Sequence, residues 1–409
     1  MMNRPISLAL VGIGGYGNHY VNAILDHGAD PAFDFIAAID PHPSACRGLD
    51  ELKARGVALF PSLESFYKST RADLVALATP IALHAPHTTL ACSRGSHVLC
   101  EKPLCATLED AAAMRDARDR FDRHVAIGYQ WSFSPAVQAL KADVLAGVFG
   151  RAKRLRTIVL WPRDESYYGR NRWAGAQRDA HGNFVWDSPV NNACAHYLHH
   201  MLYVIGPRTD RSANPASVVA ELYRAHPIEN YDTAALRIST DDGAELLFVV
   251  SHATGARVDP TYTFEFERGT VEFAGSTIIA HMNDGTTKDY GSPNDIARHK
   301  LLLTIDAIRR GEDSVCGIEA AAAHTRCAVG AQASMPQIVA FPRSIVRVTG
   351  EVGRRSTVVE GLDDVLRRCY AEWRLPTELD VSWAKAGNPI TPQPLPDFSA
   401  RSTGFQPVH

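Results

Sequence analysis

Residues 6–25 read ISLALVGIGGYGNHYVNAIL, and this stretch decides the fold of the N-terminal region. The mostly apolar residues 6–11 precede four glycines within residues 12–17, and a helical pattern follows over 18–27. The pattern predicts a buried strand that turns sharply into a helix. Gly12, Gly14 and Gly17 have the spacing G-x-G-x-x-G, which permits a tight turn, close approach of a pyrophosphate to the backbone, and close packing of helix on strand.

The next predicted strand ends in the acidic residue that a dinucleotide-binding unit needs. Residues 33–40 read FDFIAAID and end at Asp40, which would bind the adenosine ribose hydroxyls and repel a 2′-phosphate. We therefore expect NAD rather than NADP. The phosphates would meet backbone amides at the start of the helix, in the loop formed by Gly12, Ile13, Gly14, Gly15, Tyr16 and Gly17. The alternative is a glycine corner that binds nothing.

The order of predicted elements changes near residue 128. Before it, strands at 6–11, 33–40, 57–60, 72–80, 97–103 and 124–130 alternate with helices, which predicts a parallel sheet and an α/β Rossmann domain over 1–128. After it, strands joined by short turns predict an α+β domain over 129–335 with a large, mostly antiparallel open sheet. Residues 336–386 form an extension of unassigned role, and the Pro-rich segment 387–409 is predicted to be disordered.

Composition excludes several classes of function. The net charge of −3, from 42 basic and 45 acidic residues, gives no footprint for nucleic acid or anionic lipid. No apolar run approaches the length of a membrane span. We interpret the short apolar N-terminal run as a first strand rather than a signal peptide. The eight scattered cysteines include no C-x-x-C pair, so we expect reduced thiols in a cytoplasmic protein.

A second motif follows in residues 78–105, ATPIALHAPHTTLACSRGSHVLCEKPLC. The glycine fingerprint, the A-T-P-x-x-x-H pattern ending at His84, and Glu101-Lys102-Pro103 at the end of a strand together resemble the Gfo/Idh/MocA oxidoreductases over residues 6–334. The resemblance implies a CH–OH dehydrogenase that uses a nicotinamide cofactor and works as a homo-oligomer, a dimer or tetramer.

The resemblance also implies roles for individual residues. Thr79 and Pro80 would lie along the cofactor, and His84 would shape the same wall. Glu101 and Lys102 would lie near the nicotinamide ribose and ring. Lys102 would bind the reacting oxygen of the substrate, where an ammonium stabilises a developing alkoxide. The alternative for Lys102 is an ordinary surface ion pair.

A third cluster lies in residues 187–206, DSPVNNACAHYLHHMLYVIG, where the apolar spacing predicts a helix. Asn192, His196 and His200 fall at i, i+4 and i+8 and would share one helix face. The resemblance assigns His196 as the general acid/base and Asn192 as a catalytic and substrate-binding residue. This chain departs from the family pattern, because Asn192 replaces an Asp and Cys194 replaces a Gly. Asp187 is a candidate to supply the missing charge.

Other interpretations of this cluster stay open. His196 could be a core histidine. The density of ligand-capable atoms at Cys194, His196, His199 and His200 suggests a metal site, but no second cluster has zinc-site spacing, so we expect no metal.

The segment 161–175, WPRDESYYGRNRWAG, combines aromatic and guanidinium groups that suit sugar binding. The resembling family often has a Trp-Arg pair in this region that reaches the cofactor. Trp173 matches the Trp of that pair, but Ala174 stands in place of the Arg. Arg170 or Arg172 could substitute, and we assign Arg172 to the substrate. The alternative is a loop at a subunit interface.

These observations predict an NAD-dependent oxidoreductase that acts on a sugar-like polyol or its ketone. The alternative, motivated by the missing Asp, is a catalytically impaired NAD-binding sensor or scaffold of the same fold. Some relatives recycle a bound cofactor between two sugars, and others hydrolyse glycosides by oxidation and elimination. The sequence excludes neither activity for this chain.

Overall fold

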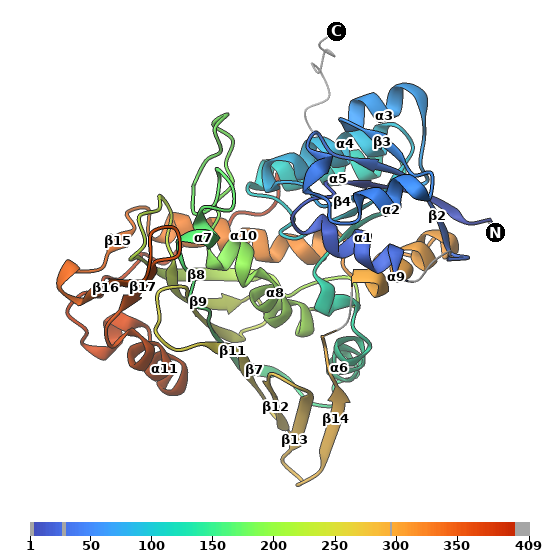
Figure 1. Cartoon of the computed structure of the whole chain (residues 1–409). Helices are drawn as coiled ribbons and strands as arrows, with labels where there is room; N and C mark the ends of the chain where they lie inside the picture. Colours follow the sequence, from blue (N-terminus) through green and yellow to red (C-terminus); the bar gives the residue numbers. More distant parts are fainter. Residues whose placement is uncertain (1–3, 27–29, 295–296, 397–409) are drawn as a thin grey trace.

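The computed structural model describes residues 4–26, 30–294 and 297–396 (Figure 1). Its N-terminal unit is a parallel six-stranded sheet in the order β3-β2-β1-β4-β5-β6. The strands are β1 Ile6–Val11, β2 Phe33–Ile39, β3 Ala58–Phe60, β4 Leu74–Leu77, β5 His97–Cys100 and β6 Val125–Ile127. The order reverses between β1 and β4, and such a switch point opens a ligand crevice at the carboxyl ends of the strands. The predicted Rossmann fold is confirmed.

Helices connect these strands as the sequence predicts. They are α1 Gly17–Leu25, α2 Leu49–Ala54, α3 Leu63–Ser69, α4 His84–Ser93 and α5 Leu108–Arg120. The start of α5 is capped by Thr107, whose hydroxyl accepts from the amide of Asp110 at 3.1 Å. Acidic residues occupy its first turn and arginines its last turn, which suits the helix dipole.

The second sheet has nine strands in the order β14-β13-β12-β11-β7-β10-β9-β8-β15. They are β7 Ala152–Leu160, β8 Pro215–Arg224, β9 Thr233–Thr240, β10 Glu245–Ser251, β11 Val258–Phe266, β12 Gly269–Ala274, β13 Ile278–Met282, β14 Thr287–Gly291 and β15 Val339–Ala340. All neighbours are antiparallel except the pairs β10–β7 and β15–β8. The predicted α+β unit with a mostly antiparallel sheet is confirmed.

Helices cover the face of this sheet that is turned toward the Rossmann unit. They include α8 Ala195–Val204 and α10 Ile318–Ser334, while α6 Pro135–Leu145 packs beside β14. The helix α10 packs on β8 and also against α5 and α8, so it lies between the two sheets (Figure 1). The helix α9 Ala297–Arg310 packs on α1. Residues from the second half of the chain therefore reach the glycine-rich corner.

The opposite face of the second sheet is covered by the C-terminal extension. This extension contains β16 Val346–Thr349, β17 Ser356–Val359 and α11 Leu362–Glu372. Side chains alternate between the faces of a strand, and the alternate residues Leu247 and Val249 of β10 pack with Leu362 and Leu366 of α11. A covering layer for the sheet is a role that the sequence did not reveal.

Residues 387–396 differ from the predicted disordered tail. The amide and carbonyl of Ile390 exchange hydrogen bonds of 2.9 and 2.8 Å with Val218 of β8, and the amide of Asn388 donates to the carbonyl of Ser334 at 2.8 Å. Backbone groups at the edge of β8 thus find partners in a Pro-rich strand-like segment. Residues 397–409, the rest of that predicted tail, lie outside the described residues.

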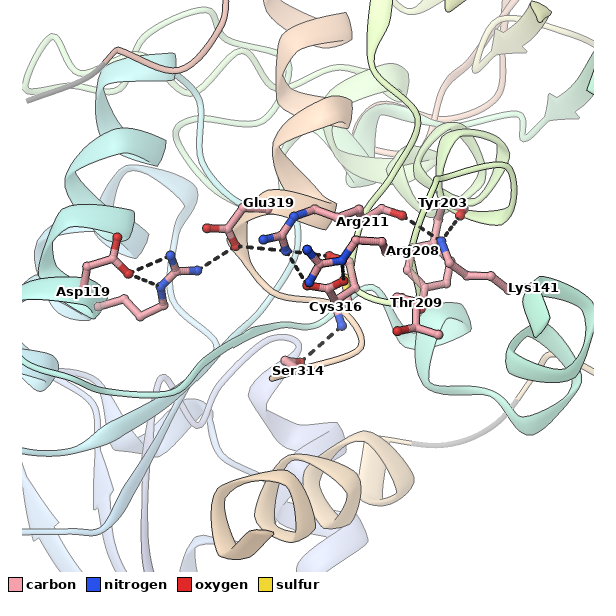
Figure 2. A network of polar contacts seen from close by, with 11 residues as sticks. Asp119, Lys141, Tyr203, Arg208, Thr209, Arg211, Ser314, Cys316 and Glu319 are labelled. Carbon is pink, nitrogen blue, oxygen red and sulfur yellow. Dashed lines mark hydrogen bonds and ion pairs between the residues drawn. The ribbon is translucent and has the colours of Figure 1, made fainter. Parts of the chain in front are cut away.

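Ion pairs connect the two units near α5 and α10 (Figure 2). Arg118 of α5 donates to Asp119 and to Glu319 of α10, the latter at 2.6 Å, and Glu319 also lies 3.9 Å from Arg211. Beside this chain, the buried Lys141 donates to the carbonyl of Arg211 at 2.7 Å. These contacts join α5 and α10 to the loop after α8, which contains Arg211.

Among the described residues, every helix is too short or too polar to cross a bilayer. All eight cysteines are buried and unpaired.

Candidate functional site

The glycine-rich loop has the geometry of a phosphate cradle. Gly12 has φ +81°, and a side chain there would lie 2.5 Å from the carbonyl oxygen of Ala78. A side chain at Gly17 would overlap the carbonyl of Gly12. Both positions therefore require glycine, the first for the turn and the second for close packing of α1. Around Gly15, which has φ +47°, the space is open.

Asp40 holds one side of this loop. Its Oδ2 accepts from the amides of Ile13 at 3.0 Å and Gly14 at 3.3 Å, and its Oδ1 accepts from the amide of His42. Within the described part of the chain, the amides of Gly15 and Tyr16 donate to no protein acceptor. Two free amides at the start of a helix fit the diphosphate of a dinucleotide. The acidic group beside them fits a ribose.

His84 links the turns that follow β4 and β5. It is buried, and its Nε2 lies 3.0 Å from the carbonyl of Thr79 while its Nδ1 lies 2.8 Å from the carbonyl of Pro103. The ring thereby links the Thr79-Pro80 turn to the Glu101-Lys102-Pro103 turn. The hydroxyl of Thr79 is buried and has no partner, so it is available to a ligand.

Glu101 lies in a buried network that the sequence did not reveal. Its carboxylate forms an ion pair with Lys300 of α9, accepts from the hydroxyl of Tyr20 at 2.6 Å, and packs against Gly128. Lys300 and Glu101 are 1% and 4% exposed, so each compensates a charge that would otherwise be costly to bury. Lys300 belongs to the site, and its helical context gave no signal of this role.

Lys102 joins the two units of the chain through its contact with Asn192. Its Nζ donates to the backbone carbonyl of Asn192 at 2.8 Å and to Asn192 Oδ1 at 3.1 Å. Burial lowers the pKa of Lys102, while Glu101 and Asp187 act in the opposite direction. The ammonium therefore faces the segment of the second unit that the sequence singled out.

The expected continuous helix over residues 187–206 is wrong in its first part. Pro189–Ala193 form a π-type turn, in which the amide of Cys194 bonds to the carbonyl of Pro189 at 2.7 Å, and α8 begins only at Ala195. Asn192 and His196 are therefore not stacked on one helix face. Pro189 at the first position of the turn, after the cap Ser188, accounts for the separate start.

Asp187 supplies a carboxylate directly behind Asn192. Its Oδ1 accepts from Asn192 Nδ2 at 2.6 Å, and its Oδ2 accepts from the amide of Gly175 at 2.6 Å and from Arg170 at 3.2 Å. The side chain of Asp187 is 3% exposed. The amide of Asn192 thus has its oxygen fixed toward Lys102 and its nitrogen fixed toward Asp187.

His196 is half-buried beside this chain of contacts. Its ring stands edge-on to Tyr129 at 5.9 Å between centroids, and its Nδ1 is buried without a partner. Burial lowers the pKa of His196 well below 6.5, and the nearby ammonium groups of Lys102 and Lys300 lower it further. The imidazole is neutral near pH 7 and can accept a proton.

The neighbouring histidines have structural roles. His199 stacks on Tyr129 at 3.9 Å and contacts the hydroxyl of Ser132 at 2.9 Å, and His200 packs among Trp131, Tyr262 and Phe264 in the core. No cluster of metal-ligating side chains occurs among the residues that the structure describes.

Tyr129 and His324 form another support that the sequence did not reveal. The hydroxyl of Tyr129 lies 2.9 Å from Nδ1 of His324, whose Nε2 donates to the carbonyl of Val190 at 3.0 Å. Burial lowers the pKa of His324 to about 4. The neutral ring therefore ties the π-type turn to α10.

The aromatic loop 161–175 lies against Asp187. Arg170 stacks on Tyr167 at 3.9 Å and lies 5.6 Å from the ring of Trp173. Arg172, which the sequence assigned to the substrate, is exposed. Of the two arginines that the sequence offered as substitutes, Arg170 is thus the one that contacts Asp187. Contact of Trp173 with a cofactor stays a prediction.

Comparison with known proteins identifies the first unit. Residues 6–129 match the family described as the Gfo/Idh/MocA oxidoreductase family, NAD-binding Rossmann fold. The chain is 32% identical over 143 residues to the rhizopine catabolism protein MocA of Rhizobium meliloti, covering 35% of this chain and 43% of that protein. It is 28% identical over 150 residues to a 1-carboxy-3-chloro-3,4-dihydroxycyclo hexa-1,5-diene dehydrogenase of Comamonas testosteroni, covering 36% and 37%. The matched part spans less than half the length of these relatives.

Likeness to solved structures extends over both units. The WlbA dehydrogenase of Chromobacterium violaceum, solved with NADH and UDP-GlcNAcA, matches with a TM-score of 0.66 and 22% identity, covering 88% of this chain and 98% of that one. At this identity the match shows a shared fold.

Proposed function

We propose that the chain, whose residues 6–129 match the Gfo/Idh/MocA oxidoreductase family, is an NAD-dependent dehydrogenase. The proposed reaction transfers a hydride between the nicotinamide and a CH–OH group of a sugar-like polyol, or the carbonyl of its ketone. Bound NAD would supply the hydride acceptor. The free amides of Gly15 and Tyr16 would hold its diphosphate, and Asp40 its ribose.

One observation carries the proposal: Lys102 Nζ, in the turn after β5, lies 2.8 Å from the backbone carbonyl oxygen of Asn192, four residues before His196. This contact brings a cation and a neutral imidazole to the same junction of the two units. Lys102 would stabilise the negative charge that develops on the oxygen of the reacting carbinol. His196 would accept the hydroxyl proton.

The supporting residues would keep these two groups in position. Asn192 orients the ammonium through its carbonyl oxygens, and Asp187 fixes the amide of Asn192. The carboxylate of Asp187 is paired with Arg170 and only favours the charged form of Lys102 from a distance. Asn192 is the neutral link between Asp187 and Lys102, so a carboxylate stays near the position where the family has its Asp.

Turnover by the purified protein tests the proposal. We expect NAD to be reduced in the presence of at least one member of a panel of sugars, polyols and sugar acids, as measured by the absorbance of the reduced nicotinamide. The control is the same panel without protein. Tight binding of NAD with no turnover across the panel would contradict the dehydrogenase and favour a cofactor-binding sensor.

Asp40 is expected to set the preference for NAD over NADP. The change Asp40→Ser removes the carboxylate that would face a 2′-phosphate, so the ratio of NADP to NAD affinity is expected to rise about 10-fold, equivalent to about 1.4 kcal/mol. Calorimetric titration with both cofactors measures this ratio. General damage to the loop would weaken binding of both cofactors equally and would leave the ratio unchanged. Asp34→Ser, at an exposed position on β2, the strand that precedes Asp40, is the control. An unchanged ratio in Asp40→Ser would exclude this role.

A further inference from the structure

Arg163 is held rigidly at the edge of the candidate site. It follows β7, and its amide donates to the carbonyl of His252 at 3.0 Å. Its carbonyl accepts from Nε2 of His226 at 3.0 Å, and His226 is itself fixed by Asp232 at 2.8 Å. The backbone of Arg163 is thus anchored to β10 and to the β8–β9 connection.

The guanidinium of Arg163 is positioned by aromatic rings but not paired with an acid. It lies 4.6 Å from the ring centroid of Tyr167 and 5.4 Å from that of Trp161. Its Nε is buried and has no hydrogen-bond partner. Within the described ranges, no carboxylate forms an ion pair with it. A half-buried cation with an unsatisfied donor calls for a partner from outside the chain.

Arg163 lies close to the reacting groups. The ring of Tyr167, on which it stacks, also carries Arg170 at 3.9 Å, and Arg170 leads through Asp187 to Asn192 and Lys102. On the other side, Trp161 packs edge-on to Tyr197 at 5.7 Å, the residue after His196. Burial raises the pKa of the Cys194 thiol to about 12, and both Arg163 and Lys102 oppose this rise. Arg163 and Lys102 thus both act on Cys194, two residues before His196.

The charge balance of the site favours an anionic ligand. Lys300 is compensated by Glu101, and Arg170 by Asp187. Lys102 contacts only the neutral oxygens of Asn192 in the described structure, and Arg163 contacts no carboxylate there. Two positive charges are therefore left at the junction. Lys102 would serve the reacting oxygen, which leaves Arg163 for a second group of the same substrate.

We propose that Arg163 binds a carboxylate of the substrate, so that the protein acts on a sugar acid, a uronate or an aldonate, rather than on a neutral sugar. This inference deepens the proposed function and rests on it. The planar guanidinium matches a carboxylate with two parallel hydrogen bonds. Stacking on Tyr167 and Trp161 keeps the plane of the guanidinium fixed, which lowers the entropic cost of binding.

Matched ligand pairs test the proposal. Calorimetry on the NADH-loaded full chain compares glucuronate with glucose and gluconate with sorbitol, and extends to other uronates and aldonates with their neutral counterparts. In at least one pair, wild type is expected to bind the acid about 10-fold or more tighter than the neutral partner. Arg163→Gln should weaken binding of that acid about 10- to 100-fold and change that of the neutral partner less than about 3-fold.

Two further variants sharpen the test. Arg163→Lys keeps the charge without the fork and should fall between wild type and Arg163→Gln. Arg154→Gln, which changes an exposed arginine on β7 that pairs with Glu245, is the matched control and should bind like wild type.

The outcomes separate the inference from the proposed function. The inference is overturned if no acid binds better than its neutral partner, or if Arg163→Gln weakens both partners equally, as a purely structural role would. Turnover of neutral polyols together with absent binding of acids would leave the dehydrogenase intact and remove the carboxylate site. Arg163-dependent binding of acids without reduction of NAD would do the reverse.

Discussion

Replacing Lys102 by Met is expected to lower kcat/KM for oxidation of the substrate by about 10³-fold, equivalent to about 4 kcal/mol of transition-state stabilisation. The ammonium lies in a buried position, where its attraction to a developing alkoxide is stronger than it would be in water. The loss should appear mainly in kcat, because the charge on the reacting oxygen develops only in the transition state. Steady-state rates of NAD reduction measure the effect.

Affinity for NAD distinguishes this role from loss of the fold. Calorimetry should find NAD binding to Lys102→Met within about 3-fold of wild type, because the proposed diphosphate contacts lie at the glycine-rich loop. Lys68→Met, an exposed lysine on α3, is the matched control. If Lys102→Met keeps more than a tenth of wild-type kcat, Lys102 is a structural link between the units and does not stabilise the reacting oxygen.

The pH dependence of the rate gives a second signature of Lys102. Burial lowers the pKa of its ammonium below the ordinary 10.5. The charged form is present below that lowered pKa and is lost as pH rises through it. The wild-type rate is therefore expected to fall at alkaline pH before 10.5 is reached, and the residual rate of Lys102→Met should lack this alkaline limb.

The Rossmann unit was predictable because its signals are local in the sequence. A strand, a glycine corner and a helix are adjacent along the chain, and parallel topology then brings the ends of β1, β2 and β4 together. Asp40 and the Thr79-Pro80 turn reach the crevice for that reason alone. The cofactor roles of these residues stay predictions that ligand binding will test.

Residues from the second unit were harder to predict, because their partners are remote in the sequence. Lys300 pairs with Glu101 across 199 positions, and the pattern around Lys300 indicates only an amphipathic helix. The spacing of apolar residues also predicts one helix over residues 187–206. It does not reveal the π-type hydrogen bond from the amide of Cys194 to the carbonyl of Pro189, five residues earlier. The position of Asp187 before the turn suggested it as a source of negative charge. Its contact with Asn192 could be found only in the structure.

The C-terminal extension bears on the predicted assembly. An open sheet face was the reason to expect a homo-oligomer, a dimer or tetramer. In this chain α11 and β17 cover part of that face through Leu362, Leu366 and Val359. A subunit contact at the covered part would have to involve the extension itself. The oligomeric state and the cytoplasmic location stay predictions.

Replacing His196 by Gln is expected to lower kcat/KM by about 10²- to 10³-fold, the usual contribution of a general base. Gln keeps the approximate size and hydrogen-bonding capacity of the imidazole but cannot take up a proton near neutral pH. Binding of NAD should be unchanged. His281→Gln, a half-exposed histidine on β13, is the matched control and should behave like wild type.

The acid limb of the pH profile tests which form of His196 is active. The pKa of His196 is lowered well below 6.5 by burial and by the charges of Lys102 and Lys300. The neutral imidazole, which oxidation of an alcohol requires, persists above that lowered pKa and is lost only as pH falls through it. The wild-type rate of oxidation should therefore stay level from about pH 8 to 6.5 and decline only below that range.

The electrostatic coupling between Lys102 and His196 allows the role of His196 to be tested without measuring turnover. Because the ammonium of Lys102 disfavours the imidazolium, Lys102→Met should raise the pKa of His196, which NMR can follow as the one histidine signal absent from His196→Gln. A titration that does not respond to loss of the lysine would show that the two groups are too far apart to share a substrate. An acid limb at or above pH 6.5 that persists in His196→Gln would assign the proton transfer to another residue.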